Sequence, residues 1–302
     1  MIQLNGLTKR YGATLAVDDL SFTVRPGLVT GFLGPNGAGK STTMRMILGL
    51  DLPTSGTATV LGRAHHELPH PLRAVGSLLE AGAAHPRRTA YKHLLYLAQT
   101  NRLPASRVDE VLGLVGLADA AGRRAGEFSL GMGQRLGIAA ALLGDPPVLL
   151  LDEPVNGLDP EGVLWIRTLI RGWAAEGRTV LLSSHLMSEM ALTADRLVVI
   201  GKGRLIAEAE IGEFTKEFAG AGDTVLVRTP EAASFARRLE LSGAHVQVGP
   251  DELLVTGMSA PDVGRLAAAE GVPLFELTPR RASLEEAFME LTRDAVEYGA
   301  AR

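Results

Sequence analysis

The sequence predicts an α/β protein with a mainly parallel core sheet, followed by a small α+β domain. Apolar, strand-like segments alternate with helical patterns through the first two thirds of the chain, and this alternation is typical of parallel sheets. A glycine-rich segment joins one of these strands to a helix. Beyond about residue 223 the pattern changes to short strands, some of them paired around turns, which indicates a second domain.

Composition narrows the class of protein. The chain has 302 residues, of which 46% are hydrophobic, enough for a large core and for more than one domain. Its net charge of -4 provides no general basic field, so we expect no nucleic-acid partner. It contains no cysteine, which excludes disulfides and cysteine-ligated zinc. No apolar run approaches the roughly 18–20 residues of a membrane helix, so we do not expect the chain to span a membrane by itself.

The first part of the chain reads as strands and helices in regular order. Segments rich in Val, Leu, Phe and Thr predict strands at 2–11, 16–24, 28–34, 57–62, 148–154, 179–185 and 196–203. Apolar residues at near-helical spacing predict helices at 42–50, at several places within 86–126, and at 131–143, 161–176 and 186–193. We therefore expect a first domain at 1–215, with a helical subdomain at about 86–145.

Glycine, proline and charged residues around 212–223 indicate a boundary. Beyond it the sequence predicts strands at 224–229, 245–249, 252–257 and 273–277, helices at 231–243 and 260–271, and a last helix at 283–296. Ser283 and Glu286 form a capping box at the start of this last helix. The βαββαβ order with a trailing helix predicts a ferredoxin-like domain at 223–302.

The segment GPNGAGKST, at 34–42, can be a glycine-rich turn or a phosphate-binding loop. Gly34, Gly39, Lys40 and Ser41 match the P-loop pattern between a predicted strand and a helix, and this context favours phosphate binding. Glycines let backbone N–H groups surround a phosphate, and Lys40 can reach the β- and γ-phosphates. The expected nucleotide-binding residues are Gly34, Asn36, Gly37, Ala38, Gly39, Lys40, Ser41 and Thr42.

A second element supports phosphate chemistry. The predicted strand VLLLDEP delivers Asp152 and Glu153 to its carboxyl end, where ligands bind in parallel sheets. We expect Asp152 and the Ser41 hydroxyl to hold Mg²⁺. Glu153 can orient and deprotonate an attacking water as the catalytic base. An acidic strand end alone is more often a helix cap, but its combination with a P-loop favours catalysis.

These motifs resemble those of the ATP-binding subunits of ABC transporters over about residues 1–215. The resemblance implies an ATPase with ATP and Mg²⁺ as its cofactors. Within it, Tyr11 resembles the aromatic that stacks on adenine, and SLGMGQR resembles the signature segment. Asp159 corresponds to the D-loop aspartate, and His185 to the switch histidine near the γ-phosphate. The resemblance also implies a head-to-tail dimer, in which Ser129, Gly131 and Met132 contact the ATP of the partner subunit.

Two positions depart from the family pattern. The signature Leu-Ser-Gly-Gly-Gln is replaced by Phe-Ser-Leu-Gly-Met at 128–132, which keeps the chemically required Ser129 and Gly131. The Q-loop glutamine is replaced by Glu80, which can ligate Mg²⁺ or take part in catalysis but, when ionised, cannot donate a hydrogen bond. The segments GSLLE and SLGMGQR and the stretch Pro86–Thr89 together resemble the bacitracin-resistance type of drug exporter, and the C-terminal SLEEAFMELT resembles the tail of that subgroup.

The expected function is therefore an ATPase that powers export of a drug, antibiotic or other hydrophobic compound. The resemblance implies a second ATPase subunit, forming a homodimer, and a separate membrane permease that holds the protein at the cytoplasmic face of the membrane. One alternative is a soluble ABC ATPase acting on a ribosome or another macromolecular complex. A further alternative gives the C-terminal domain a ligand-sensing role.

Overall fold

The computed structural model describes residues 1–80, 82–184, 187–218, 224–249, 252–280 and 288. The chain forms two compact units, the first spanning Met1–Ile211 and the second Gly212–Arg293. Each unit has its own cluster of buried apolar side chains.

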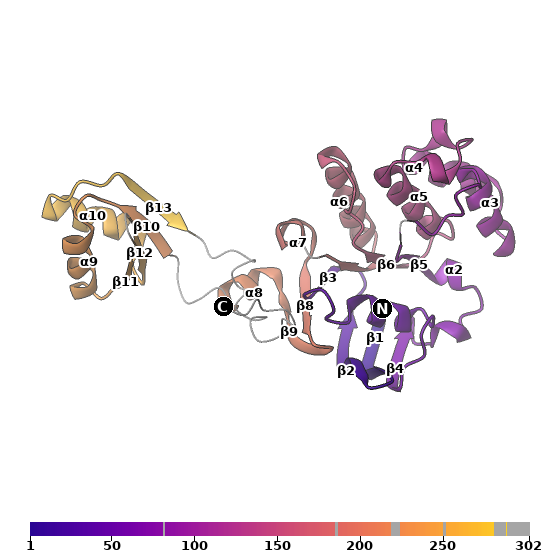
Figure 1. Ribbon diagram of the computed structural model, residues 1–302, viewed down its shortest axis with the longest axis horizontal. Helices are drawn as coiled ribbons and strands as arrows, with labels where there is room; N and C mark the ends of the chain where they lie inside the picture. The colour runs from indigo at the N-terminus through magenta and orange to yellow at the C-terminus, as the bar shows by residue number, and fades with distance from the viewer. Residues whose placement is uncertain (81, 185–186, 219–223, 250–251, 281–287, 289–302) are drawn as a thin grey trace. The chain divides into compact units, whose positions relative to one another are not determined.

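A six-stranded sheet forms the centre of the first unit, with the strand order β5-β6-β7-β3-β8-β9 (Figure 1). Its strands are β3 (Val29–Leu33), β5 (Val75–Leu78), β6 (Val148–Asp152), β7 (Thr179–Ser183), β8 (Arg196–Gly201) and β9 (Arg204–Glu210). All neighbours pair in parallel except β8 and β9. This confirms the mainly parallel sheet. Because β3, β6 and β7 are parallel, their carboxyl ends lie on the same side of the sheet.

The antiparallel edge strand β9 was not among the strands predicted from sequence. A tight turn at Lys202 and Gly203, which both have positive φ, joins it to β8. Such turns reverse the chain between antiparallel strands. Side chains along β9 are only partly buried because it lies at the sheet edge, so its apolar pattern is weak.

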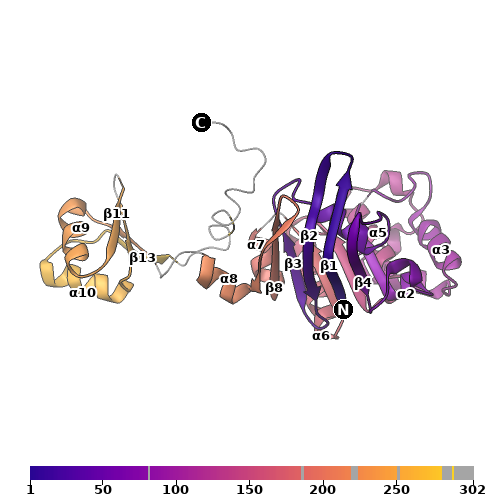
Figure 2. The ribbon, with the colours of Figure 1, turned by 90° about the horizontal axis from the view of Figure 1, so that it is seen from below.

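A second, antiparallel sheet has the order β2-β1-β4, formed by β1 (Ile2–Tyr11), β2 (Thr14–Val24) and β4 (Ser55–Val60). Figure 2 shows it beside the central sheet. The core between them joins apolar side chains of both sheets and of α1 (Lys40–Ile47). For example, the rings of Phe22 and Phe32 lie 5.4 Å apart between centroids. This core anchors the loop that precedes α1.

The helical subdomain consists mainly of α3 (Ala90–Thr100), α4 (Ser106–Leu114) and α5 (Leu130–Leu142). The segment before α3 is held to the segment before α5, because the Gly126 N–H donates to the Pro86 carbonyl at 2.9 Å. The remaining helices of this unit are α2 (Pro71–Ala74), α6 (Pro160–Ala175) and α7 (Met187–Thr193), with short 3-10 turns at His65–Glu67, Ala118–Ala120 and Ala125–Glu127. Ser129 caps α5, which places the signature segment at a helix start.

The second unit includes all of α8 (Ile211–Phe218) except its first residue, and one antiparallel sheet with the order β11-β12-β10-β13. The other elements are β10 (Thr224–Arg228), α9 (Ala232–Leu241), β11 (His245–Val248), β12 (Leu253–Thr256), α10 (Ala260–Glu270) and β13 (Glu276–Arg280). This strand order and the βαββαβ sequence of elements are those of a ferredoxin-like fold. The expected last helix, with Ser283 and Glu286, lies outside the described residues apart from Phe288.

The last strand of this sheet starts three residues later than the sequence predicted, at Glu276 instead of residue 273. Its pairing with β10 runs from Glu276 opposite Arg228 to Arg280 opposite Thr224. Pro279 lies within it, which is tolerated because β13 is an edge strand. The observed strand also continues three residues beyond the predicted end at residue 277 and includes Pro279.

Because each unit has its own core, a chain that ends near Gly222 should fold and bind nucleotide. Thermal unfolding and titration with fluorescent ATP would check this. As a control, Phe235→Ala in the full chain removes a fully buried side chain from the core of the second unit. This change should lower the unfolding free energy of that unit by about 3–5 kcal/mol. Nucleotide binding should be unchanged in that variant. Aggregation of the shortened chain would show that the two units depend on one another for folding.

Candidate nucleotide site

The loop between β3 and α1 approaches its neighbours so closely that two positions accept only glycine. A Cβ atom on Gly34 would lie 2.6 Å from the Ile200 carbonyl oxygen. At Gly39 the backbone is left-handed, with φ 102°, and a Cβ atom would lie 2.6 Å from the Ala16 carbonyl oxygen. Glycine adopts this conformation without the steric cost of a side chain. The loop is thereby held against β2 and β8 in front of the α1 N-terminus.

Lys40, the first residue of α1, is buried and turns back into this loop. Its Nζ donates to the carbonyl oxygens of Gly34 at 2.6 Å and Pro35 at 3.2 Å. Burial lowers the pKa of Lys40 from its usual 10.5, and the charges of Glu153 and Asp152 oppose this shift. The loop therefore carries a partly desolvated cation close to two carboxylates.

The Asp152 carboxylate joins three elements at the sheet edge. It accepts a hydrogen bond from the Ser41 hydroxyl of α1 at 2.8 Å. Its other oxygen accepts from the Ser183 hydroxyl at the end of β7. Aspartate and hydroxyl oxygens are ligands that Mg²⁺ accepts, and Mg²⁺ usually completes its shell with water and phosphate. The residues present therefore fit a magnesium ion bound together with a nucleotide.

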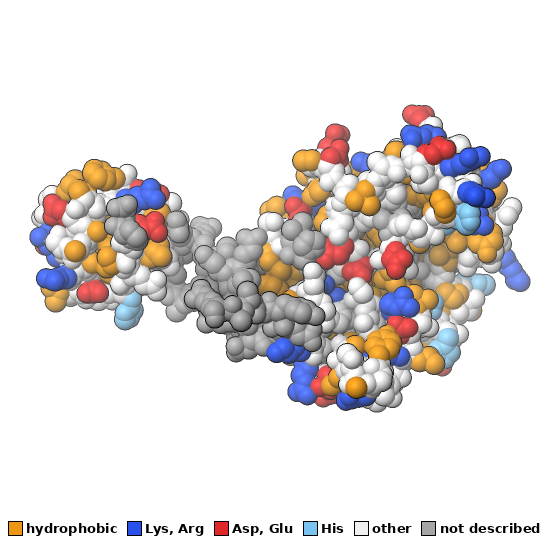
Figure 3. Space-filling view, in the orientation of Figure 1, with side chains coloured by type: hydrophobic (Ala, Val, Ile, Leu, Met, Phe, Trp, Pro, Cys, Tyr) orange, Lys and Arg blue, Asp and Glu red, His pale blue; other side chains and the backbone are white. Residues whose placement is uncertain are grey.

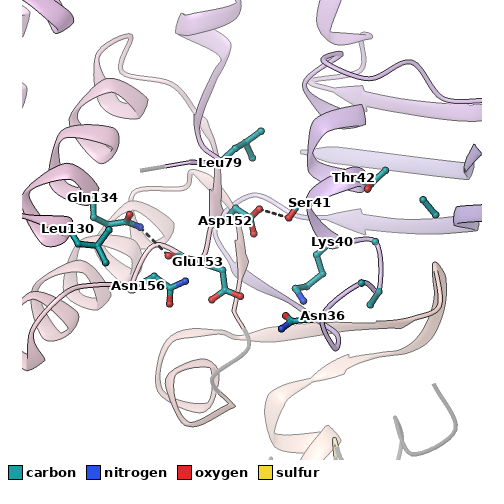
Figure 4. A pocket seen from close by; sticks show the side chains of 14 residues that line it. Asn36, Lys40, Ser41, Thr42, Leu79, Leu130, Gln134, Asp152, Glu153 and Asn156 are labelled. Atoms are coloured by element: carbon teal, nitrogen blue, oxygen red, sulfur yellow. Dashed lines mark hydrogen bonds between the residues drawn. The ribbon is translucent and has the colours of Figure 1, made fainter. Parts of the chain in front are cut away.

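Glu153 has a strained backbone with φ 50°, a conformation that is uncommon for residues other than glycine. Its N–H donates to the carbonyl and the hydroxyl of Ser183, at 3.2 and 3.0 Å. Its carbonyl accepts from Nε2 of Gln134 in α5 at 3.1 Å. These bonds hold the strained residue so that its carboxylate points into the pocket, between Asn156 and Lys40 (Figure 4).

One pocket of about 470 Å³ brings most of the predicted residues together. Those that line it are Asn36, Gly37, Ala38, Gly39, Lys40, Ser41, Thr42, Asp152 and Glu153. Five further lining residues were not predicted from sequence, namely Ala16, Leu79, Leu130, Gln134 and Asn156. Leu130 and Gln134 lie within the signature segment SLGMGQR, so the position of this segment in the sequence could have pointed to them. The pocket thus combines a cation, oxygen donors and carboxylates, as phosphate hydrolysis requires.

Among the described residues predicted to bind nucleotide or metal or to act in catalysis, three do not line this pocket, namely Tyr11, Gly34 and Glu80. Tyr11 is 46% exposed, and its hydroxyl donates to Asp51 at 2.9 Å. Glu80 is exposed and lines a separate hollow with Arg45 and His93. Glu80 thus lies outside the phosphate pocket, and its expected metal-binding and catalytic roles stay predictions. The adenine contact of Tyr11 stays a prediction.

The signature segment begins at an exposed helix start. The Ser129 hydroxyl accepts from the Met132 N–H at 3.2 Å, and Gly131 follows within the first turn of α5. A Cβ atom on Gly131 would lie 3.0 Å from the Gly157 carbonyl oxygen, so this turn packs closely on the loop that precedes α6. Asp159 caps α6 by accepting from the Gly162 N–H at 2.8 Å. His185 lies outside the described residues.

Comparison with known proteins identifies the family. The ABC transporter family pattern matches residues 17–156. The bacitracin transport ATP-binding protein BcrA of Enterococcus faecalis is 34% identical over 96% of both chains. The chain belongs to the ATP-binding subunits of ABC transporters. The Nod factor export ATP-binding protein I of Burkholderia orbicola is also 34% identical over 96% of both chains. Residues 223–285 match a domain family of unknown function.

Solved structures agree with this family. The structure of an ATP-binding subunit of an ABC transporter has a TM-score of 0.67 and 27% identity, covering 72% of this chain and 93% of the other. A dimeric ABC cassette in a post-hydrolysis state, bound to ADP and phosphate, has a TM-score of 0.63 and 25% identity, covering 70% and 99%. The chain is thus an ABC-type ATPase. Within its described part, no helix combines the length and apolar character needed to cross a bilayer.

The lowered pKa of Lys40 predicts that ATP binding weakens at alkaline pH. The protonated ammonium binds phosphate, so affinity is present below the pKa of Lys40 and is lost as the pH rises through it. This loss should begin below the usual lysine pKa of 10.5 and can be followed by titration with fluorescent ATP. Lys40→Ala should abolish binding at every pH. Lys40→Arg keeps its positive charge at alkaline pH, so any ATP affinity that this variant retains should not fall there. If its affinity fell at the same pH as that of the wild type, deprotonation of Lys40 would not be the cause.

Proposed function

We propose that the chain hydrolyses ATP as one half of a homodimer and thereby powers an exporter with a separate membrane permease. The observation that carries this proposal is the meeting of Lys40, Ser41, Asp152 and Glu153 in one pocket. These residues provide a phosphate-binding cation, two oxygen donors for a magnesium ion and a carboxylate base. These groups are the ones that one chain would contribute to phosphoryl transfer to water.

Each residue has a distinct role in the proposed reaction. Lys40 leaves the carbonyls of Gly34 and Pro35 to contact the β- and γ-phosphates, while backbone N–H groups of the loop surround them. Ser41 and Asp152 would hold Mg²⁺, which neutralises phosphate charge when bound. Glu153 orients a water molecule and accepts its proton as the oxygen attacks the γ-phosphorus. The bond between the γ-phosphorus and the β–γ bridging oxygen breaks, and this oxygen stays on ADP.

The exposed signature segment supports a dimer. Leu130 is 64% exposed although it lines the pocket edge, and Ser129 is also exposed. In the head-to-tail arrangement, Ser129, Gly131 and Met132 would contact the nucleotide of the partner subunit, and Asp159 would lie at the subunit interface. His185 would contact the γ-phosphate. A dimer of this kind contains two complete sites, because each chain supplies one loop and one signature segment.

The names of the two relatives support export as the coupled process. One relative is named for bacitracin transport and the other for Nod factor export. We infer a permease that moves a drug, an antibiotic or another hydrophobic compound and holds this subunit at the cytoplasmic face of the membrane. The proposed contact surface is the segment from Glu80 to Leu97. Figure 3 shows Lys and Arg side chains gathered over the helices α3 and α4 of the same subdomain.

Glu153→Gln preserves the shape of the side chain but removes the base. ATP hydrolysis should fall by roughly 10²-fold or more, while ATP still binds because Lys40 and the loop are unchanged. An ATP-bound dimer should then accumulate and be visible by size-exclusion chromatography. Glu176→Gln, at an exposed glutamate just after α6, is a control and should retain wild-type turnover. Wild-type turnover in Glu153→Gln would reject Glu153 as the base.

Arg87→Glu should weaken the permease contact, because Arg87 is exposed within the proposed contact segment. The expected result is less co-purified membrane protein from solubilised membranes and less transport, with smaller effects on basal ATPase activity. Arg25→Glu reverses the charge of another exposed arginine, just after β2, and should leave recovery unchanged. Equal recovery and transport in Arg87→Glu would reject this contact. No membrane protein recovered with the wild type would favour an ABC ATPase that acts on a macromolecular complex.

A further inference from the structure

Gln134 connects two parts of the site that the proposed reaction uses separately. It lies in α5 one turn after Leu130, so the two side chains share one face of the helix. The first turn of α5 carries the signature residues. The Gln134 side chain is only 3% exposed, and its Nε2 donates to the Glu153 carbonyl at 3.1 Å. A single rigid helix therefore contains both the exposed signature turn and a buried contact to Glu153.

The Glu153 backbone needs such a contact. A residue other than glycine at φ 50° has a conformation that persists only when surrounding contacts hold it. Two of the described contacts come from Ser183, which belongs to the central sheet. The contact from Gln134 comes from the helical subdomain. The position of the Glu153 carboxylate thus depends on both parts of the first unit.

A second close approach ties the same helix to the loop after Glu153. A Cβ atom on Gly157 would lie 2.3 Å from a Leu130 side-chain carbon, so Leu130 packs directly on the Gly157 backbone. Because Leu130 and Gln134 contact the 153–157 segment from one helical face, a shift of α5 must move this segment or break these contacts. Packed interfaces of this kind change between discrete arrangements rather than deform gradually.

We propose that Gln134 is a positioning residue, which holds the Glu153 backbone and couples the placement of the catalytic carboxylate to the position of the signature helix. The proposal rests on the proposed role of Glu153 as the base. When α5 engages a nucleotide of the partner subunit, the Gln134 amide transmits its position to Glu153 of the same chain. Hydrolysis then proceeds fastest once the signature segment is engaged.

Gln134→Met keeps the approximate length of the side chain but removes the donor. In the full-length protein, kcat for ATP hydrolysis should fall about 10- to 100-fold, with KM and fluorescent-ATP affinity near those of the wild type. Arg107→Met is a matched control, since Arg107 donates to the Leu142 and Leu143 carbonyls at the opposite end of α5. The control can lower the thermal unfolding temperature but should keep kcat. Loss of ATP affinity together with kcat in Gln134→Met would show a general supporting role and overturn the proposal.

Gln134→Glu tests the donor itself. A protonated carboxyl can donate to the Glu153 carbonyl, whereas an ionised one repels it, and burial favours the protonated form. The kcat of Gln134→Glu relative to the wild type should therefore rise as the pH falls from about 8 to about 6. For Gln134→Met the same ratio should stay constant. A constant ratio in both variants would overturn the hydrogen-bond role.

The double variant separates this inference from the proposed function. If Gln134 acts through Glu153, adding Gln134→Met to Glu153→Gln should lower kcat by less than about threefold, because residues that act as a unit are not additive. A full additional loss would overturn the coupling. Wild-type turnover in Glu153→Gln would reject the base and this inference together. Lost turnover in Glu153→Gln with wild-type turnover in Gln134→Met would reject only the role of Gln134.

Discussion

The Asp152 carboxylate is the contact on which the rest of the site depends. Parallel pairing of β6 with β7 places Asp152 beside Ser183, whose hydroxyl donates to it. Its other oxygen accepts from Ser41, so the carboxylate fixes the start of α1 relative to the sheet. Hydrogen bonds to a charged group are stronger than those between neutral groups. Removal of this charge would therefore weaken the link between the start of α1 and the end of β7.

The buried ammonium group of Lys40 is hydrogen-bonded to carbonyl oxygens, which carry only partial negative charge. Burial disfavours its charged form, and the carbonyls of Gly34 and Pro35 offset part of that cost. A phosphate provides full negative charge and can replace these carbonyls. The loop itself need not move far, because close contacts at Gly34 and Gly39 already define its path. In the proposed reaction, phosphate binding would include this exchange of partners at the ammonium group of Lys40.

The helix α5 has an exposed first turn and, one turn later, a buried contact to the central part of the site. Its start leaves Ser129 and Leu130 exposed, whereas Gln134 one turn later is buried against the Glu153 backbone. Leu130 is exposed at the edge of the pocket although its side chain also packs on the Gly157 backbone. The buried contact explains how a strained backbone at Glu153 can persist, since strain at functional sites is held by surrounding contacts. The same helix therefore carries both the exposed signature segment and the buried contact to Glu153.

Local patterns in the sequence determined the parallel sheet, the ferredoxin-like unit, and the loop and strand end that meet in the pocket. These features follow from residue spacing and from the conformations open to glycine, which depend on near neighbours in the chain. The edge strand β9 was missed and β13 misplaced because edge strands bury little and tolerate proline. Only the tertiary structure decided that Gln134 and Ser183 hold the Glu153 backbone, and that Tyr11 and Glu80 lie outside the phosphate pocket. Those contacts join residues far apart in the sequence, so they exist only after the sheet and the helical subdomain have packed together.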